Sequence, residues 1–343
     1  MTPISDLGEF ALIRRLTDAL PIRNASTVKG VGDDCAVLKY NGSNVLTTTD
    51  MLLEGVHFDL VYTPLKHLGY KAAAVNISDI LACGGTPRQL LVSVAVDRRI
   101  SVESLDELYA GLRLCCDHYG ADLVGGDTSS SLTGLTLSLT ALGEAADEEV
   151  VYRSGAKEND LICVSGNLGA AYLGLQLLER EKRVFAGTKQ SDETAAQPDF
   201  SGYEYLLERF LKPEPRADIL QRLREADVHP TAMIDISDGL SSELLHICRE
   251  SGCGCRIYEE RLPIDYQTAK CAEEFNLNVS TCALNGGEDY ELLFTVPLSS
   301  HERIQEIDDV RIIGHITRPD LGTRLITRGE ADEVELKAQG WKL

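Results

Sequence analysis

Short acidic motifs recur along this chain, each placing aspartate beside glycine, threonine, serine or another aspartate. Mg²⁺ prefers carboxylate and other hard oxygen ligands, and it leaves its remaining positions to water and substrate phosphate. Taken together, the motifs predict a site where Mg²⁺ ions bridge phosphoryl oxygens. The motifs are Gly32-Asp33-Asp34, Thr48-Thr49-Asp50, Asn76-Ile77-Ser78-Asp79, Gly125-Gly126-Asp127 and Asp235-Ile236-Ser237-Asp238-Gly239.

Three of these motifs also have an ordinary structural explanation. The adjacent carboxylates of Asp33 and Asp34 repel each other unless they are solvated or bound to a cation, so a solvated turn is the alternative there. Asp50 follows a predicted strand, where a turn or N-cap residue is equally common. The glycines before Asp127 let a backbone approach a phosphate closely, but a Gly-Gly-Asp sequence is also a common turn.

Of the other two motifs, the one that ends in Asp79 is the more informative. Asp79 and Asn76 are three residues apart in a predicted helix and therefore share a face. A carboxylate near a buried apolar stripe needs a partner, and the alternative is that this face is exposed. We expect Asp235 and Ser237 to alternate on one strand face, and Asp238 either joins them or caps the next helix.

Hydrophobic periodicity predicts strands and helices mixed in both halves of the chain, with a boundary near the polar residues 145–149. Four of the five motifs then lie at a predicted strand end or turn, where open α/β folds place ligands. The predicted helices cover 6–20, 65–83, 102–119 and 170–181, with another beginning at 241. The predicted strands cover 45–49, 90–96, 122–124, 135–142, 160–164, 234–237 and 290–296, and a surface loop is predicted over 189–199.

Composition excludes several classes of protein. The net charge of −21 repels nucleic acid and anionic membranes, so we expect neither as a partner. The chain of 343 residues has no basic-then-apolar leader and no apolar run of about 20 residues. Its ten cysteines form no Cys-x-x-Cys pair, which favours reduced, mostly buried thiols and a cytoplasmic location.

Other phosphate and metal chemistries fit the sequence poorly. It lacks the Gly-x-x-x-x-Gly-Lys-Ser/Thr loop and the protein-kinase motif set. It also lacks a Gly-x-Ser-x-Gly elbow, and the residues before Gly239 do not supply the acidic spacing of a calcium EF-hand loop.

The ordered set of motifs resembles the bacterial thiamine-monophosphate kinase family over nearly the whole chain. The resemblance rests on Gly32–Ala36, Thr49-Asp50, Gly55–Phe58, Tyr70–Ala72, Val75–Asp79, Gly125–Thr128, Arg153–Ala156, Asp235–Leu240 and Gly286–Leu292.

The resemblance implies a mixed α/β (α+β) protein with the two-domain aminoimidazole ribonucleotide synthetase-like fold. Residues 1–146 would form an ATP- and Mg²⁺-binding domain whose sheet makes a barrel at a homodimer interface. Residues 147–343 would form an α/β domain that completes the cleft. The implied reaction is Mg²⁺-dependent transfer of the ATP γ-phosphate to thiamine monophosphate, giving thiamine diphosphate and ADP, with no general base from the protein.

The resemblance also implies roles for individual residues. Several Mg²⁺ ions would be held by Asp34, Thr48, Thr49, Asp50, Asp79, Asp127, Asp235 and Asp238. ATP would contact Gly126, Asp127, Arg153 and Ser237. Thiamine monophosphate would contact His57, Glu288 and Trp341, although the chain ends Gly340-Trp341-Lys342-Leu343, without the family's final His-Phe, and this only tryptophan could equally be a packing residue.

Related enzymes are the first alternatives. His57 and the run from Gly286 to Glu291 favour the thiamine enzyme over aminoimidazole ribonucleotide synthetase. Selenophosphate synthetase would carry a reactive cysteine or its equivalent near the N-terminus, whereas the first cysteine here is Cys35. The hydrogenase-maturation relative ends in cysteine, unlike this chain. A nucleotide-binding regulator without activity is a further alternative, which the intact acidic set disfavours.

Overall fold

The fold is described from a computed structural model that covers residues 13, 17, 22–40, 42–187, 200–329 and 332–338. Within the helix predicted over 6–20, Ile13 and Thr17 are described, and both are helical. The rest of that helix, the loop predicted over 189–199 and Trp341 lie outside the described residues.

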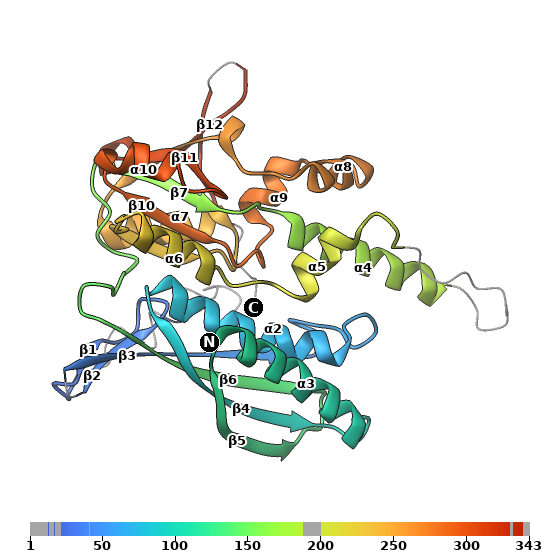
Figure 1. Ribbon diagram of the computed structural model, residues 1–343. Coiled ribbons are helices and arrows are strands. Elements are labelled where there is room, and N and C mark those ends of the chain that lie inside the picture. The colour runs from blue at the N-terminus through green and yellow to red at the C-terminus, as the bar shows by residue number, and fades with distance from the viewer. Residues whose placement is uncertain are drawn as a thin grey trace, which may run out of the picture.

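Among the described residues, six strands form the first sheet, in the spatial order β1-β2-β3-β6-β4-β5 (Figure 1). Neighbouring strands run antiparallel, except that β4 and β5 are parallel. The strands are β1 (Thr27–Lys29), β2 (Ala36–Tyr40), β3 (Ser43–Leu53), β4 (Thr86–Val96), β5 (Asp122–Ser130) and β6 (Thr136–Ala145).

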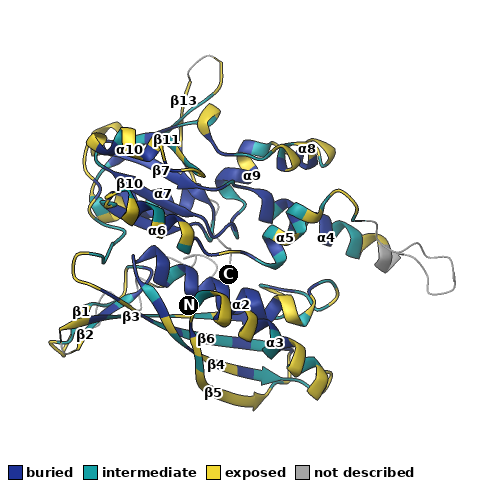
Figure 2. Cartoon of the chain, viewed as in Figure 1, coloured by how far each residue is buried: buried dark blue, intermediate teal, exposed yellow. Residues whose placement is uncertain are grey.

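The two faces of this sheet differ in burial. Alternate residues such as Leu46, Leu90 and Leu137 are fully buried on the face that packs against α2 (Leu65–Ala82) and α3 (Val102–Tyr119). No described helix packs on the opposite face, where Met51 is 56% exposed and Leu91 is 36% exposed. The edge strand β5 is mostly exposed along its length (Figure 2).

Two glycines allow α2 and α3 to pack closely. A Cβ at Gly69 would lie 1.9 Å from the carbonyl oxygen of Leu108, and one at Gly111 would lie 1.9 Å from that of Lys66. Any side chain at either position would push the helices apart. The two glycines therefore fix the short separation between α2 and α3.

Helix α2 lies between the first sheet and the C-terminal half, and it contacts β8 and α5 (Figure 1). It is buried around most of its circumference (Figure 2). A helix in this position should be apolar all round. Instead it buries Lys71, Asn76 and Ser78, with Asp79 half-buried. Buried polar groups need partners, so this helix is where a functional site is expected.

The second sheet has the spatial order β13-β12-β9-β11-β7-β10-β8 among the described residues. Only the β12–β9 pair is parallel. Strands β7, β8 and β10 are buried throughout, as expected for a sheet covered on both faces. The strands are β7 (Leu161–Ser165), β8 (Ala232–Asp235), β9 (Gly254–Tyr258), β10 (Leu292–Val296), β11 (Val310–Thr317), β12 (Thr323–Ile326) and β13 (Glu333–Glu335).

Helices surround this sheet and extend from it (Figure 1). Helix α7 follows β8 directly and contacts it, while α4 and α5 pack against each other beside α8 and α9. The α-helices are α4 (Ala170–Gly187), α5 (Glu204–Leu211), α6 (Ala217–Glu225), α7 (Leu240–Ser251), α8 (Tyr266–Glu274), α9 (Val279–Asn285) and α10 (His301–Gln305). Short 3₁₀ helices are η2 (Glu259–Arg261), η3 (Leu298–Ser300) and η4 (Pro319–Leu321).

The mixed α/β class with a sheet in each half is confirmed, and the helix predicted over 102–119 has those bounds. Within the described residues neither sheet closes into a barrel, so the barrel stays a prediction about a dimer. None of the described helices is long and apolar enough to cross a membrane.

Three local predictions are wrong. Asp50 does not end its strand, because β3 continues to Leu53. Gly125–Asp127 is not a turn, since it lies inside β5. Ser237 does not share a strand face with Asp235, because β8 ends at Asp235. In each case pairing with a neighbouring strand sets where the strand ends, and the local sequence does not show that position.

Candidate functional site

Three carboxylates from distant parts of the chain meet in one cluster. Asp34 precedes β2, Asp79 lies near the end of α2, and Asp235 ends β8. One carboxylate oxygen from each lies within 4.8 Å of those of the other two. The cluster therefore joins the first sheet, the buried helix and the second sheet at one point.

Hydrogen bonds hold each carboxylate in place. The hydroxyl of Thr48 donates to Asp79 at 2.5 Å, and that of Ser78 donates to Asp235 at 2.5 Å. The guanidinium of Arg153 pairs with Asp34 at 2.5 Å. The cluster is thus oriented before any ligand arrives.

Burial and mutual repulsion raise the pKa values of the clustered carboxylates. Burial, followed by the charges of Asp235, Asp50 and Asp34, raises the pKa of Asp79 well above its usual value. Burial, with the charge of Asp34 next, raises the pKa of Asp235 to about 7 and that of Asp50 to about 6. Burial also raises the pKa of Asp34, against the opposing charge of Arg153. Such a group of carboxylates takes up either protons or a cation.

Asp33 has a different role from Asp34. Its Oδ1 accepts a 2.8 Å hydrogen bond from the backbone N–H of Arg153, and Lys29 lies 3.5 Å from its other oxygen. Asp33 therefore positions the residue that pairs with Asp34, and is not part of the cluster. The Oδ2 atoms of Asp33 and Asp34 are buried without a hydrogen-bond partner among the described residues.

The cluster opens into a cavity of about 850 Å³, here called the acidic cavity. Eleven of the predicted site residues line it, which brings together motifs more than 250 residues apart in the chain. They are Asp34, Thr48, Thr49, Asp50, His57, Asp79, Arg153, Asp235, Ser237, Asp238 and Glu288.

The hydroxyl of Thr49 is directed away from the carboxylate cluster. It donates to the carbonyl oxygen of Leu139 at 2.7 Å and accepts from Thr140 at 3.2 Å. Successive strand residues point to opposite faces, so the hydroxyl that reaches the cluster is that of Thr48. The predicted metal contact of Thr49 therefore has no support from its side-chain direction.

The alternative that Asp238 caps the following helix is not supported. Gly239 is the N-cap of α7, and no side chain caps it. Instead the buried carboxylate of Glu243 accepts the backbone N–H of Asp238 at 2.8 Å. Glu243 holds the Asp238 backbone in place, and Asp238 lines the acidic cavity.

A second cavity of about 400 Å³ adjoins the first and is here called the aromatic cavity. The two cavities share Val56, His57, Ser237, Asp238 and Glu288. Four aromatic rings line the second one, together with carboxylates. These residues are Phe58, Tyr62, Tyr172 and Phe210, with Asp59 and Glu179.

His57 and Glu288, both predicted substrate contacts, stand where the two cavities meet. The Nδ1 atom of His57 accepts the backbone N–H of Leu53 at 3.1 Å, which fixes the ring at the end of β3. Glu288 has a left-handed backbone with φ 63°, and its N–H donates to the carbonyl oxygen of Ser237 at 2.7 Å. A Cβ at the preceding Gly287 would lie 2.5 Å from that same oxygen, so only glycine fits.

The rest of the Gly286–Glu291 motif is structural. The carboxylate of Asp289 accepts the N–H of Gly169 just before α4. The buried carboxylate of Glu291 pairs with Arg209 at 2.8 Å and with Arg216 at 2.6 Å, tying α5 and the start of α6 to β10. These contacts hold Glu288 in its position.

Gly126 and Asp127 lie away from the acidic cavity. Strand pairing aligns Gly126 with Asp50 across β4 and β6, three strand spacings away, which is about 14 Å. Asp127 is exposed on the edge strand. A Cβ at Gly126 would lie 1.8 Å from the carbonyl oxygen of Val92, so this glycine is needed for strand packing.

Lys71 and Tyr290, which have no predicted role, also line the acidic cavity. Lys71 is 4% exposed, and its ammonium pairs with Glu288 and donates to the carbonyl oxygen of Phe210 at 3.0 Å. Burial raises the pKa of Tyr290 well above its usual value, so its hydroxyl stays protonated and can donate. A lysine inside an otherwise buried helix was the available signal, because such a charge needs a partner.

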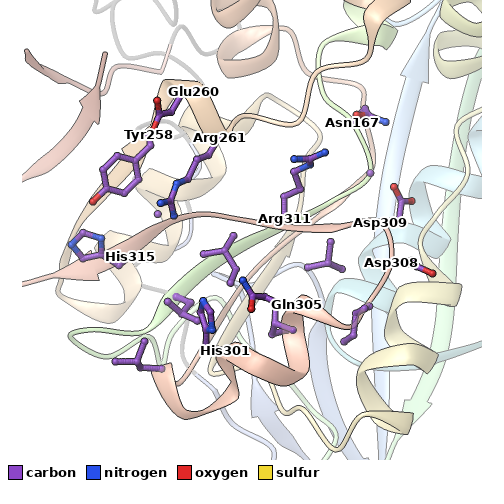
Figure 3. Close-up of a pocket in the computed structure, with 18 of the residues that line it drawn as sticks. Asn167, Tyr258, Glu260, Arg261, His301, Gln305, Asp308, Asp309, Arg311 and His315 are labelled. Carbon is purple, nitrogen blue, oxygen red and sulfur yellow. The ribbon is translucent and has the colours of Figure 1, made fainter. Parts of the chain in front are cut away.

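A larger cavity, of about 1200 Å³, lies over β11 and α10 and is not this site (Figure 3). None of the predicted site residues that the structure describes lines it. Arg261 lies over the ring of Tyr258, and Asp309 pairs with Arg216. Arginines and carboxylates are mixed around it, without a cluster of one charge. The chemistry of the lining residues, and not the size of the cavity, therefore identifies the functional site.

The N-terminal half of the chain carries a domain of the AIR synthase related class. Residues 32–145 match the family described as AIR synthase related protein, N-terminal domain. Solved structures of the hydrogenase maturation protein HypE share the fold at 18% identity, one with a TM-score of 0.67 over 99% of both chains.

More specifically, the chain belongs to the thiamine-monophosphate kinase family. It is 34% identical to thiamine-monophosphate kinase of Aquifex aeolicus over 99% of both chains. It is 36% identical to that of Bacillus subtilis over 88% of this chain and 87% of the relative. The solved structure of AaThiL complexed with AMPPCP and TMP is 32% identical, with a TM-score of 0.80 over 98% of both chains.

Proposed function

We propose that this protein is a thiamine-monophosphate kinase, which transfers the γ-phosphate of ATP to thiamine monophosphate and gives thiamine diphosphate and ADP. The main observation behind this proposal is that the Asp34–Asp79–Asp235 cluster opens into the acidic cavity. That cavity is joined to the aromatic cavity, which is lined by aromatic rings and carboxylates. The first suits metal-bound phosphates and the second suits an aromatic cation. Family membership over the whole chain supports the same reaction.

The cluster fits Mg²⁺ by its chemistry. Its ligands are hard carboxylate oxygens, the pKa of each clustered aspartate is raised, and Asp34 has a buried oxygen without a partner. Asp34, Asp50, Asp79 and Asp235 would hold the ions, with the hydroxyl of Thr48 and the carboxylate of Asp238 nearby. Bound Mg²⁺ neutralises phosphate charge and orients the phosphoryl oxygens.

Arg153 and Ser237 are the ATP contacts of the chain's own acidic cavity. The Arg153 guanidinium is 22% exposed at its side chain, so it can reach a phosphate while its Nη2 remains on Asp34. Planar guanidinium groups suit phosphate oxygens. The solved relative with AMPPCP, an ATP analogue, supports a nucleotide in this cleft.

The aromatic cavity is the proposed place for thiamine. The thiazolium ring of thiamine carries a permanent positive charge, and aromatic faces attract such cations. Tyr62, Tyr172 and Phe210 supply rings, and Glu179 supplies a carboxylate, which accepts a hydrogen bond from Tyr62 at 2.8 Å. Asp59 is already paired with Lys182 at 2.5 Å, which closes one side of the cavity. The monophosphate would then extend past His57 and Glu288 towards the acidic cavity.

The reaction needs no proton acceptor from the protein. The nucleophile is an oxygen of the monophosphate, whose second pKa is about 6, so it is anionic near neutral pH. The obstacle is repulsion between two polyanions, about 4 kcal/mol for each pair of unit charges at 4 Å in an effective dielectric of 20. The protein's contribution is to hold both phosphates in line and to offset their charge.

We infer that the working protein is a homodimer formed through the sheet face that α2 and α3 leave uncovered. That face exposes Met51, Leu91 and Val124, which is unusual for a sheet that stays in water. Strand register places Asp127 beside Ser93 at the edge of this sheet. Since its own cavity is about 14 Å away by strand spacing, Asp127 serves as a ligand in the cavity of the second copy.

Three other expectations stay predictions. The strands divide between two sheets on either side of residues 146–160, which supports domains at 1–146 and 147–343. All ten cysteines are free and nine of them are buried, which supports a reducing cytoplasm. The contact of Trp341 with thiamine falls outside the described residues.

Release of ADP with a panel of acceptors tests the function. Thiamine monophosphate with ATP and Mg²⁺ should give turnover, whereas thiamine, inorganic phosphate or excess EDTA should not. Turnover with thiamine itself would show that the acceptor is a hydroxyl and would contradict the proposal.

A further inference from the structure

The proposed reaction gives no role to the buried ammonium of Lys71. Lys71 lies on the face of α2 that borders the acidic cavity, 4% exposed. Its described contacts are the Glu288 carboxylate, the carbonyl oxygen of Phe210 at 3.0 Å, and the Phe210 ring, whose centroid is 3.9 Å from Nζ. Burying a lysine among these groups is costly unless its charge is used.

The three partners come from different parts of the fold. Lys71 belongs to α2 in the N-terminal half, whereas Phe210 is in α5 and Glu288 lies in the loop before β10. Phe210 lines the aromatic cavity, and Glu288 lines both cavities. The ammonium therefore connects the wall of the aromatic cavity to the residue at the junction of the two.

The carboxylate of Glu288 needs a partner, because the backbone fixes the start of the side chain but not the position of its carboxylate. The φ of 63° and the hydrogen bond to Ser237 fix the main chain. The side chain is 21% exposed at the cavity junction, and Lys71 is its only ion-pair partner among the described residues. Without that partner the carboxylate can rotate away from the aromatic cavity.

We propose that Lys71 is a positioning residue for substrate recognition: its ammonium holds the Glu288 carboxylate at the entrance of the aromatic cavity, where that carboxylate binds the cationic thiamine moiety. This inference rests on the proposed function. It assigns Lys71 to binding of the acceptor and not to the nucleotide or to the metal cluster.

The test compares Lys71→Met, Lys71→Arg and Glu288→Gln with the wild type. Lys71→Met keeps the length of the side chain and removes its charge, and Lys66→Met is the matched control because Lys66 is exposed on the same helix. Steady-state kinetics give KM for each substrate, and calorimetric titration with thiamine monophosphate and no nucleotide gives Kd.

Lys71→Met should raise KM and Kd for thiamine monophosphate roughly tenfold or more, as expected when a buried charge loses its partner, with KM for ATP changed less than about twofold. Lys71→Arg should recover part of the loss. Lys71→Met combined with Glu288→Gln should bind no more weakly than Glu288→Gln alone, because both changes remove the same interaction. Lys66→Met should behave as the wild type.

A purely structural lysine would lower kcat in proportion to the folded fraction and leave KM and Kd for thiamine monophosphate unchanged. That result, or additive effects of the two substitutions, would overturn the inference. A wild-type protein that binds thiamine monophosphate without transferring phosphate would contradict the proposed function alone, since the Kd comparison still decides the role of Lys71. A wild type that does not bind it would overturn both.

Discussion

The hydroxyl of Thr48, on β3, donates a 2.5 Å hydrogen bond to the carboxylate of Asp79, near the end of the buried helix α2. This bond connects the first sheet to the helix that also contacts β8. It favours the ionised form of Asp79, while burial and three neighbouring aspartates oppose it. The ionised form of Asp79, which the proposed metal site requires, therefore comes at a cost to the stability of the fold.

Substitution of Asp79 should raise the stability of the metal-free protein and reduce its stabilisation by Mg²⁺. Asp79→Asn removes one of the repelling charges, so in EDTA its Tm should rise by roughly 2 °C or more. Excess Mg²⁺ should raise the Tm of the wild type and raise that of Asp79→Asn much less. Scanning calorimetry with and without Mg²⁺ measures both, and exposed Asp106→Asn on α3 is the control. A variant less stable than the wild type in EDTA would show that the cluster is not under repulsion.

Stability of the metal-free protein should depend on pH with a defined sign. The pKa of Asp50 is raised to about 6 and that of Asp235 to about 7. Between the ordinary aspartate pKa of 3.8 and these raised values, the folded state therefore binds more protons than the unfolded state. Stability is then greatest at the acidic end of that window and falls as pH rises from about 4 to about 7.

Urea unfolding in EDTA at several pH values measures this dependence. Asp235→Asn should make this dependence shallower, because one of the carboxylates whose pKa is raised is removed. Carboxylates with lowered pKa, such as Asp59 and Asp218, act below this window and do not mask the effect. Stability that rises with pH over the window would contradict the assignment.

The acidic residues illustrate what sequence predicts well. Residue type and the short acidic motifs around them predict Asp34, Asp79 and Asp235 as ligands, and all three meet in one cluster. The face of a strand residue is harder to predict. Thr48 and Thr49 are equivalent as sequence, and only the pairing of β3 with β6 decides which hydroxyl reaches Asp79.

Long-range placement is the part that sequence does not determine. The sequence predicts that Gly126 either approaches a phosphate or forms a turn, whereas the pairing of β5 with β4 shows that it has a packing role. Lys71 was part of a motif without an assigned role, because its partners Phe210 and Glu288 lie far along the chain. Contacts of this kind depend on how α2 is enclosed between the two halves.

The adjacent glycines of β5 should respond differently to alanine. A Cβ at Gly126 would lie 1.8 Å from the carbonyl oxygen of Val92, whereas one at Gly125 would meet nothing within 4 Å. Gly126→Ala should lower the free energy of unfolding by about 1–3 kcal/mol. Gly125→Ala should stay within about 0.5 kcal/mol. Urea unfolding measures both, and equal effects would show that the close approach of β4 is not what requires glycine.

Mixing inactive variants should reveal which chain uses Asp127. If it serves the partner, a heterodimer of Asp50→Asn and Asp127→Asn subunits has one site with both substitutions and one intact site. Random mixing of the two should then restore roughly a quarter of wild-type activity. If Asp127 serves its own chain, every site carries one substitution and no activity returns. Co-refolding of differently tagged subunits, followed by the ADP-release assay, distinguishes the two outcomes.

The most direct test of the central claim is to follow the phosphates themselves. Phosphorus NMR of the protein with ATP, Mg²⁺ and thiamine monophosphate should show the monophosphate signal replaced by the two coupled signals of thiamine diphosphate, with ADP in equal amount. Asp50→Asn, folded by circular dichroism, should leave the spectrum unchanged. ADP with inorganic phosphate and no thiamine diphosphate, or no reaction by the wild type, would contradict the account.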